Sequence, residues 1–408
     1  MSINPKINNP DAKMLKVLVA PLDWGLGHAT RCIPIIKELV NQGCTVIIAA
    51  SGPQKILLQE EFPTLRFVEI PGYRVKYGKN RALTILQLIV SLPKILIRIK
   101  QENRWLRRFS RLEQPDLVLS DNRYGLYRRG IVCVFITHQL FIRTPFGAAT
   151  DWLLQRINYS AIRHFSCCWV PDIPGPDSLA GELSHPRNMP SIPTRYIGWL
   201  SRFGAAGAAE LSADVTDAVV TGVMDYDLLV LLSGPEPQRT ILEKMILEQA
   251  AGSGYKIALV RGLPGRGLRV GASGGGLAGA PPGIAVHDHL PAGELEVLIR
   301  RSEVVLSRSG YSTVMDLVRL RRRAVYIPTP GQTEQEYLGK YLAERRLAIC
   351  VEQRGFSLQD ALIKAQDLRV RPAVENGLLK NEIKILLERV SAPWAGGGRA
   401  QSAVADLG

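Results

Sequence analysis

Short apolar runs alternate with helical stretches along this 408-residue chain, and the alternation occurs twice. The first series has predicted strands at 16–20, 45–50, 66–70, 117–119, 132–137 and 167–170, with helices such as 32–40 and 82–111. The second has strands at 228–232, 256–260, 284–286, 304–306 and 324–327, with helices at 238–251, 293–301 and 313–320. Strands that alternate with helices form parallel sheets covered on both faces. The pattern predicts two doubly wound, Rossmann-like α/β domains.

Composition indicates where the two series are joined. Prolines are dense from 171 to 193, and residues 201–221 are rich in Ala, Gly and Ser, as in connecting segments. We expect a flexible tail at 1–13, a first Rossmann-like domain at 14–190, a linker at 191–226, a second Rossmann-like domain at 227–372, a helix at 373–394 and a flexible tail at 395–408. Two such halves would face each other across a cleft, where ligands commonly bind.

Several protein classes are disfavoured. The first residues, MSINPKINNPDAK, contain no apolar run typical of a secretory signal. No apolar stretch reaches the roughly 18 residues of a spanning helix, and the longest, 82–92, ends at Pro93-Lys94. Six cysteines without a CxxC pair suggest reduced, buried thiols, although the adjacent Cys167-Cys168 could also form a redox site. We expect a cytoplasmic protein.

The net charge of +14 is concentrated in the first half of the chain. Residues 1–200 hold 26 Lys and Arg against 14 Asp and Glu, and residues 73–111 alone hold eleven basic residues and one acid, Glu102. A basic stretch with many aliphatic residues is typical of a protein that contacts an anionic membrane surface, here on the inner face of the membrane. The alternative is a core helix with a basic outer face. No recognition helix or aromatic platform accompanies the charge, so nucleic acid is disfavoured.

The first candidate motif, 24–30, reads WGLGHAT and follows the first predicted strand. Glycines such as Gly25 and Gly27 let backbone amides approach a ligand, and the start of a helix favours anions. The motif is not a dinucleotide fingerprint, because Thr30 stands where that pattern needs glycine. His28, at the carboxyl end of the strand, has the chemistry of a base toward a hydroxyl. A tight turn without a ligand is the alternative.

Asp121 ends another predicted strand of the first half and would lie at the same sheet edge as His28. One hypothesis is that Asp121 orients His28, and the alternative is that it only caps a turn. His138, which follows the strand at 132–137, is a competing candidate base.

Two further motifs lie at strand–helix junctions of the second half. In 307–316, SRSGYSTVMD, a serine–glycine loop leads into a helix with Ser312 or Thr313 as expected N-cap. Such a junction suits phosphate, and Asp316 could accept hydrogen bonds from ribose hydroxyls or simply be stabilised by the helix dipole. In 328–337, PTPGQTEQEY, amides and carboxylates could hold sugar hydroxyls.

Residues 304–345 resemble the donor-binding half of GT-B glycosyltransferases, especially the family that adds N-acetylglucosamine to the lipid-linked peptidoglycan precursor. The run SRSGYSTVMD is similar to that family's serine–arginine–small–glycine run with an acid six residues after the glycine. The resemblance implies a GT-B fold, with Ser309 and Gly310 at the diphosphate and Asp316 at the donor ribose. It implies a sugar contact for Gln335, whereas Glu336 departs from the family's second glutamine.

Weaker similarity extends the resemblance to the rest of the chain. Ser233-Gly234 resembles the family's phosphate-contacting serine loop. Val286-His287 stands where the family's backbone contacts uracil. Gly25, Gly27 and His28 resemble its N-terminal glycine-rich loop, although Asp23-Trp24 replaces part of the glycine run.

Three features are interpreted as unrelated to the site. Asp225-Tyr226-Asp227 matches a metal-binding DxD pattern but precedes a strand instead of ending one. His287-Asp288-His289 lacks further ligands at metal spacing, and the arginines of 319–323 fit a solvated helix end. We expect no metal and no cofactor other than the UDP-sugar co-substrate.

The sequence therefore predicts a glycosyltransferase that moves a hexose or N-acetylhexosamine from a UDP-sugar to an acceptor hydroxyl, with inversion and without a metal. The acceptor would be a glycan, a small molecule or a lipid-linked, membrane-proximal molecule. Two alternatives remain at this point: a UDP-sugar 2-epimerase or hydrolase on the same fold, and a non-catalytic protein that binds polyanions or membranes.

Overall fold

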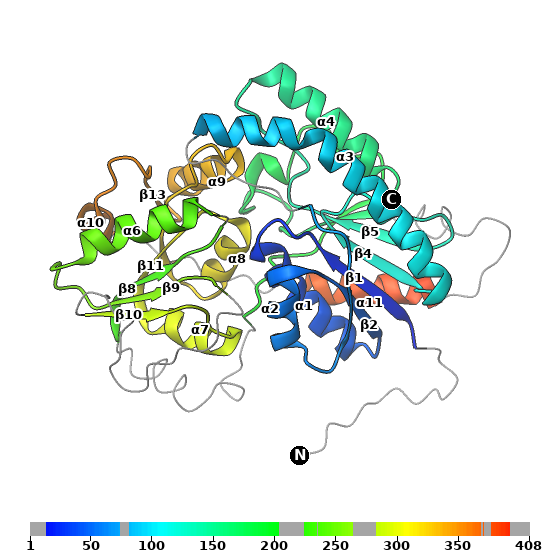
Figure 1. Ribbon diagram of the computed structural model, residues 1–408, viewed down its shortest axis with the longest axis horizontal. Coiled ribbons are helices and arrows are strands. Elements are labelled where there is room, and N and C mark those ends of the chain that lie inside the picture. Colours follow the sequence, from blue (N-terminus) through cyan, green and yellow to red (C-terminus); the bar gives the residue numbers. More distant parts are fainter. Residues whose placement is uncertain are drawn as a thin grey trace, which may run out of the picture.

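The computed structural model describes residues 14–73, 81–203, 224–234, 236–263, 283–368, 370 and 377–391. Two parallel sheets lie side by side, each with helices on both faces (Figure 1). This arrangement confirms the expected pair of Rossmann-like domains. The expected tails at 1–13 and 395–408 and most of the expected linker lie outside the described residues.

The first sheet has seven parallel strands in the order β3-β2-β1-β4-β5-β6-β7. They are β1 (Lys16–Pro21), β2 (Thr45–Ala49), β3 (Arg66–Val68), β4 (Leu117–Asp121), β5 (Val132–Ile136), β6 (Cys167–Val170) and β7 (Thr194–Tyr196). The helices of this half are α1 (Leu26–Asn41), α2 (Gly52–Glu61), α3 (Arg81–Leu112) and α4 (Ala148–Ile162), with a 3-10 turn at Gly181–Leu183. Alternate residues of β1 pack into cores on opposite faces, which explains why the strand is apolar throughout.

The second sheet has six parallel strands in the order β10-β9-β8-β11-β12-β13. They are β8 (Tyr226–Leu231), β9 (Ile257–Val260), β10 (Ile284–His287), β11 (Ser302–Ser307), β12 (Arg323–Tyr326) and β13 (Ile349–Cys350). The helices are α6 (Gln238–Ala250), α7 (Ala292–Arg300), α8 (Tyr311–Arg319), α9 (Thr333–Glu344) and α10 (Leu358–Gln366). The final helix, α11 (Leu378–Ser391), returns to the first half and contacts α1 (Figure 1).

The expected boundary between first domain and linker is wrong. β7 pairs with β6 at the edge of the first sheet, so this domain extends past residue 190 into the range expected as linker. β8 already begins at Tyr226, the last residue of that range. Prolines around residues 190–193 obscured β7, and an edge strand tolerates such neighbours because one of its sides forms no ladder.

Two helices begin earlier than expected. α1 begins at Leu26, not near Cys32, so that His28 lies in its first turn. Only Gly25 has the left-handed backbone, with φ of 101°, whereas Gly27 is helical and lies against Ser312 of α8. α8 begins at Tyr311 with Gly310 as its cap, and neither Ser312 nor Thr313 caps it.

α4 was not predicted from the sequence. Most of its residues are half-buried or exposed, and large apolar side chains such as Trp152, Leu153 and Ile157 face solvent. The usual apolar stripe on one face is therefore missing. Within the described part of the chain, no helix is long and apolar enough to cross a bilayer.

Candidate active site at the seam between the two halves

His28 is positioned by the turn between β1 and α1. Gly25 caps α1 in a conformation that L side chains rarely adopt, and the helix starts at the next residue. His28 therefore projects from the first turn of α1, close to the carboxyl end of β1. Its side chain is 16% exposed, which leaves the imidazole accessible from one side.

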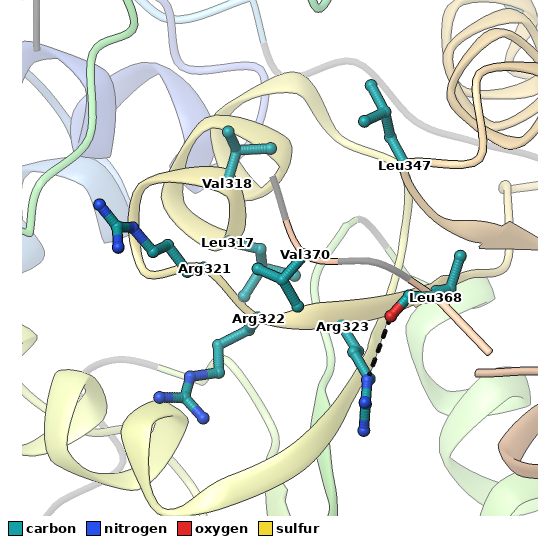
Figure 2. A pocket seen from close by; sticks show the side chains of 8 residues that line it. All are labelled: Leu317, Val318, Arg321, Arg322, Arg323, Leu347, Leu368 and Val370. Carbon is teal, nitrogen blue, oxygen red and sulfur yellow. Dashed lines mark hydrogen bonds between the residues drawn. The ribbon is translucent and has the colours of Figure 1, made fainter. Parts of the chain in front are cut away.

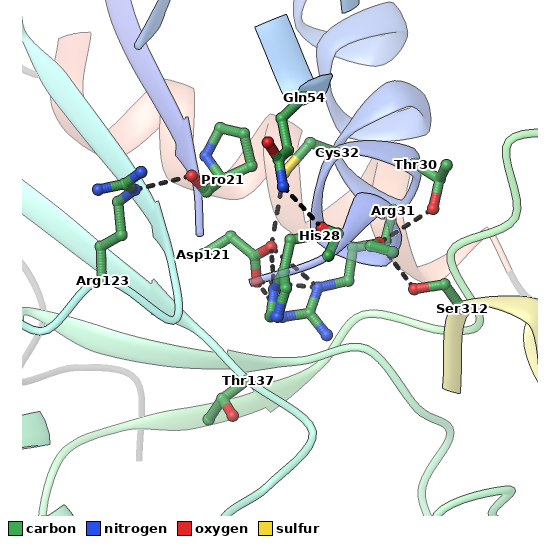
Figure 3. Close-up of polar contacts among 12 residues, drawn as sticks. Pro21, His28, Thr30, Arg31, Cys32, Gln54, Asp121, Arg123, Thr137 and Ser312 are labelled. Atoms are coloured by element: carbon green, nitrogen blue, oxygen red, sulfur yellow. Dashed lines mark hydrogen bonds and ion pairs between the residues drawn. The ribbon is translucent and has the colours of Figure 1, made fainter. Parts of the chain in front are cut away.

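Asp121 is brought to His28 by the sheet order. β4 lies next to β1, and the register places Asp121 beside Pro21, the last residue of β1. The Nδ1 atom of His28 lies 3.0 Å from an Asp121 carboxylate oxygen (Figure 3). The two residues are 93 positions apart in the chain, and the structure brings them together as expected.

Arg31, one turn after His28, is the central residue that the sequence analysis missed. Its Nε atom donates to both Asp121 oxygens at 2.9 and 3.0 Å, and its Nη2 atom also contacts Asp121 (Figure 3). The same Nη2 atom lies 2.7 Å from Nδ1 of His28. The available signal was the i, i+3 spacing, which puts His28 and Arg31 on one helix face.

The protonation of this cluster follows from its burial and its charges. Burial would raise the pKa of Asp121, but Arg31 and His28 outweigh it and the pKa is lowered. Burial, assisted by Arg31, lowers the pKa of His28, although Asp121 acts in the opposite direction. Both shifts favour an ionised Asp121 beside a neutral imidazole.

His138 connects this cluster to the second half of the chain. Arg31 Nη1 lies 3.1 Å from His138 Nδ1, and His138 Nε2 lies 2.8 Å from a carboxylate oxygen of Glu334 at the start of α9. The His138 ring also stacks on Tyr311 of α8 at 4.2 Å. Arg31 and Glu334 therefore engage both ring nitrogens of His138, and neither nitrogen is left for an acceptor hydroxyl. This argues against His138 as the competing base.

Direct hydrogen bonds hold the two halves together around His28. The hydroxyl of Ser312 donates to the carbonyl oxygen of Gly27 at 2.7 Å (Figure 3). The hydroxyl of Tyr311 donates to the carbonyl oxygen of Pro171 at 2.8 Å. We call this contact between α1 and α8 the seam. Because Gly27 and Ser312 are in contact, the loops after β1 and β11 meet there.

Asp316 lies on α8, and its carboxylate is already hydrogen-bonded to residues of this chain. Its carboxylate accepts from the Ser201 hydroxyl at 2.7 Å, from Arg202 N at 3.2 Å and from Arg202 Nε at 3.0 Å. Burial raises its pKa, with Arg202 opposing the rise. Asp316 thus anchors the chain that leaves the first half, and its contact with a donor ribose stays a prediction.

Gln335 and Glu336 organise the loop that precedes α9. Gln335 accepts from Thr329 N at 2.8 Å, and its backbone oxygen accepts from the Ser309 hydroxyl at 2.7 Å. Glu336 accepts from Gly331 N at 2.9 Å. The structure therefore joins the Ser309-Gly310 loop to the 328–337 motif, which were separate candidates in the sequence.

The remaining candidates lie at the corresponding edge of the second sheet. Ser233 and Gly234 follow β8, and Gly234 has φ of 95°. Val286 and His287 end β10, the edge strand, where the His287 backbone oxygen accepts from Arg261 N at 2.8 Å. Burial lowers the pKa of His287. Carboxyl ends of parallel strands are the usual ligand-binding edge of such sheets.

The residues that resemble metal ligands have other partners. Asp225 pairs with Arg301 at 3.2 Å, and Asp227 accepts from Lys256 N at 2.8 Å. Asp288 pairs with Arg261 at 2.8 Å. Across the described ranges, no group of three or more His, Cys, Asp or Glu side chains is arranged to hold a metal ion.

Two cavities lie in the second half, away from these residues. One, of about 20 Å³, is lined by Arg321, Arg322 and Arg323 with aliphatic neighbours at the end of α8 (Figure 2). The other, of about 180 Å³, lies between β13 and α10. The first holds little more than one water molecule, and neither is lined by a candidate site residue.

Solved structures show the same fold over nearly the whole chain. The spinosyn rhamnosyltransferase SpnG matches with a TM-score of 0.56 and 14% identity, covering 96% of this chain and 98% of its own. The glycosyltransferase SnogD from Streptomyces nogalater matches with a TM-score of 0.51 and 16% identity, covering 93% and 95%. The chain has the GT-B fold. Identity this low establishes the GT-B architecture alone.

A family model and several sequence relatives match part of the chain. Residues 292–375 match the glycosyltransferase family 28 C-terminal domain. The UDP-N-acetylglucosamine--N-acetylmuramyl-(pentapeptide) pyrophosphoryl-undecaprenol N-acetylglucosamine transferase of Rickettsia felis is 30% identical over 87 residues, 21% of this chain and 24% of that protein. An uncharacterized glycosyltransferase of Methanosarcina acetivorans is 30% identical over 119 residues, 27% and 28% of the two chains. The matches span about a quarter of each relative, and they confirm the resemblance inferred from 304–345.

Proposed function

We propose that this protein is a glycosyltransferase that moves a hexose or N-acetylhexosamine from a UDP-sugar to an acceptor hydroxyl. The observation that carries the proposal is the position of the His28–Asp121 pair. The two side chains lie 3.0 Å apart at the seam, where α1 meets the first turn of α8. α8 lies within residues 292–375, which match the glycosyltransferase family 28 C-terminal domain. A base from one half then faces donor-binding loops from the other.

His28 acts as the base in this mechanism. Its Nδ1 faces Asp121, which leaves Nε2 on the opposite side of the ring. Nε2 takes the acceptor proton while the acceptor oxygen bonds to the anomeric carbon, and the bond from that carbon to the β-phosphate oxygen breaks. UDP leaves as an anion. Acceptor and leaving group lie on opposite sides of the sugar, so the anomeric configuration inverts.

The second half stabilises the leaving diphosphate without a metal. The first amides of α8 and the turn at Ser309-Gly310 are oriented before the reaction, and helix N-termini attract anions. Ser233 and Gly234 supply a second loop at the same sheet edge. Gln335 and Glu336, on the neighbouring junction, are assigned to the sugar hydroxyls, and Asp316 to the ribose.

The acceptor side is assigned to the first half and to a membrane surface. Large apolar side chains on α3 and at α4 face solvent: Val90, Leu96, Ile97, Phe146, Trp152, Leu153 and Ile157. Basic residues, including Lys94, Lys100 and Arg156, lie on the same two helices, which pack against one apolar core. An apolar surface with Lys and Arg around it binds anionic bilayers, each charge contributing about 1 kcal/mol. A lipid-linked acceptor would be reached from there. Residues 74–80 of the basic segment lie outside the residues that the structure describes.

Calorimetric titration with UDP, thymidine diphosphate and a panel of UDP-sugars tests the donor assignment. We expect UDP binding that weakens about tenfold in Asp316→Asn, the loss of one good hydrogen bond, but not in Asp225→Asn, whose carboxylate pairs with Arg301. Thymidine diphosphate belongs in the panel because one solved neighbour, at 16% identity, is SpnG complexed with it.

Each other outcome favours a different function. UDP release without acceptor favours the epimerase or hydrolase. Liposome or heparin binding without nucleotide affinity favours the non-catalytic protein and contradicts the proposal. Loss of transfer in a chelator contradicts metal independence.

A further inference from the structure

Arg31 is the most completely engaged charged residue of the candidate site. It is 2% exposed, and its guanidinium contacts Asp121, His28 and His138. Two of its nitrogens bind the Asp121 carboxylate, which is the fork geometry that makes arginine–carboxylate pairs strong. Nothing in the mechanism above uses this cation.

The geometry around His28 places opposite demands on its Nδ1 atom. Asp121, at 3.0 Å, is an acceptor and favours a proton on Nδ1. Arg31 Nη2, at 2.7 Å, is a donor and carries a fixed positive charge. An imidazolium at this position would lie against a guanidinium in a buried site. A neutral ring meets one demand at a time: a proton on Nδ1 satisfies Asp121, whereas a bare Nδ1 accepts the second Nη2 hydrogen of Arg31.

We propose that Arg31 is a positioning residue that holds the Asp121 carboxylate and keeps the His28 imidazole uncharged. The catalytic meaning of this role rests on the proposed function. The physical effect on His28 does not, since it concerns only the state of one ring in the free protein. Asp121 alone would favour the charged ring, and Arg31 offsets it.

Among the described residues, three charged side chains influence the pKa of His28. Asp121 approaches from β4, Arg31 from α1 and Glu334 from α9, while His138 contacts Arg31 and Glu334. Burial and Arg31 lower the pKa of His28, and Asp121 and Glu334 raise it. Removing Arg31 leaves only burial to oppose the two carboxylates, so we expect the pKa of His28 to rise.

Nuclear magnetic resonance of the histidine rings tests this directly. The chain has six histidines, and His28→Gln identifies the His28 signal. In Arg31→Gln we expect the His28 titration midpoint to rise by about one pH unit or more. Arg31→Lys keeps the charge and should keep most of the original midpoint. A midpoint that stays or falls in Arg31→Gln would overturn the proposal.

Arg123→Gln is the matched control. Arg123 is also fully buried in the first half, but it binds Glu102 and the carbonyl oxygens of Pro21 and Pro71. Its removal disturbs a buried ion pair of the same domain without changing the charges that face His28. We expect the His28 midpoint to be unchanged, and a rise equal to that in Arg31→Gln would contradict a specific role.

The unaltered protein supplies a test that does not depend on the stability of a variant. At neutral pH, ring ¹⁵N shifts should show an uncharged His28, and a charged ring overturns the proposal. The same spectra report the tautomer, and a proton on Nε2 would contradict the base role of Nε2 in the proposed function. Transfer assays separate the two proposals: with the NMR result as expected, full turnover in His28→Gln contradicts only the catalytic role of His28.

Discussion

At the scale of single residues, the cluster around Asp121 shows how a buried carboxylate is tolerated. Asp121 is fully buried, and the interior accepts its charge because Arg31 and His28 bind both oxygens. Removing one partner of such a pair typically costs about 3–5 kcal/mol, since the other charge stays buried alone. An exposed pair such as Lys340–Glu344 contributes about 0–1 kcal/mol. Only the buried pair constrains the fold and the chemistry together.

Replacing the proposed base tests the mechanism most directly. In His28→Asn we expect kcat to fall by about 10²–10⁴, the usual contribution of a general base, with little change in donor affinity. Asp121→Asn should also lower kcat, because it removes the group that orients His28. Steady-state kinetics measures both. Turnover near that of the unaltered protein in both variants would rule out the pair.

The lowered pKa of His28 predicts where activity is lost in acid. A base must be unprotonated in the free enzyme, so kcat/KM falls as the pH drops through the pKa of His28. Burial and Arg31 hold that pKa below its ordinary value of 6.5. We therefore expect the midpoint of the acid decline to lie below pH 6.5 in a pH series of kcat/KM. A decline that begins well above 6.5 is inconsistent with this environment of His28.

Sequence reasoning predicted His28 and Asp121 as a pair but not their neighbours. Both follow predicted strands, and the carboxyl ends of adjacent parallel strands meet at one sheet edge. Arg31 shares a helix face with His28, and Glu334 lies in the 328–337 motif, but neither signal identifies a partner. Their contacts depend on the rotation of α1 and on the approach of the second half, which these local patterns do not encode.

At the scale of elements, α1 and α8 form the contact on which the site depends. Both helices begin at a glycine cap and both point their first turns at the seam. Ser312 was expected to cap α8, but its hydroxyl instead bonds to Gly27 of α1. A polar side chain near a helix start therefore serves a contact between domains here, and its role was decided by the partner element.

The close packing of Gly27 against Ser312 gives a test of this seam. A Cβ at position 27 would lie 3.0 Å from the Ser312 hydroxyl oxygen. We expect Gly27→Ala to lower the melting temperature, and Ser312→Ala to reduce that loss in the double variant. A double-mutant cycle by thermal unfolding should show coupling of about 0.5–3 kcal/mol. Strict additivity would mean that the two residues do not interact.

The exposed apolar residues of α4 predict membrane binding by this helix. Trp152 and Leu153 are 56% and 50% exposed, and Arg156 lies over the Trp152 ring. We expect Trp152→Glu with Leu153→Glu to weaken binding to anionic liposomes at least tenfold in a flotation assay, because charge is placed in the contact.

Ile363→Glu is the control for the liposome experiment. Ile363 is 53% exposed on α10, which belongs to the second half, so this change should leave liposome binding intact. Equal losses in the two proteins would indicate a general effect of charge. Undiminished binding of the α4 variant would remove this helix from the membrane contact.

At the scale of the whole molecule, two segments of the chain connect its two halves. The linker anchors to α8 through Asp316, and α11 returns from the second half to pack on α1. The core that includes β1 and α1 also includes residues of α8, α9 and α11. The two domains therefore share part of one apolar core in addition to the seam.

Removing apolar contact from α11 should destabilise the molecule. Ile383 is fully buried, and Ile383→Ala is expected to cost about 2–5 kcal/mol through lost contacts and the cavity left behind. Ile385 is 38% exposed on the same helix, and Ile385→Ala controls for helix propensity with a small effect. Denaturant unfolding of both measures the difference. Equal costs would mean that α11 is not held by its buried face.

Sequence patterns were enough to predict the two α/β halves, the strands that carry the site and the resemblance of 304–345 to a donor-binding domain. These follow from local periodicity and from motifs that lie next to one another in the chain. The tertiary structure decided the edge strand β7, the early start of α1, and the meeting of Arg31, His138 and Glu334. Those contacts join residues up to 196 positions apart, and they form because buried charges must find partners once both sheets are in place.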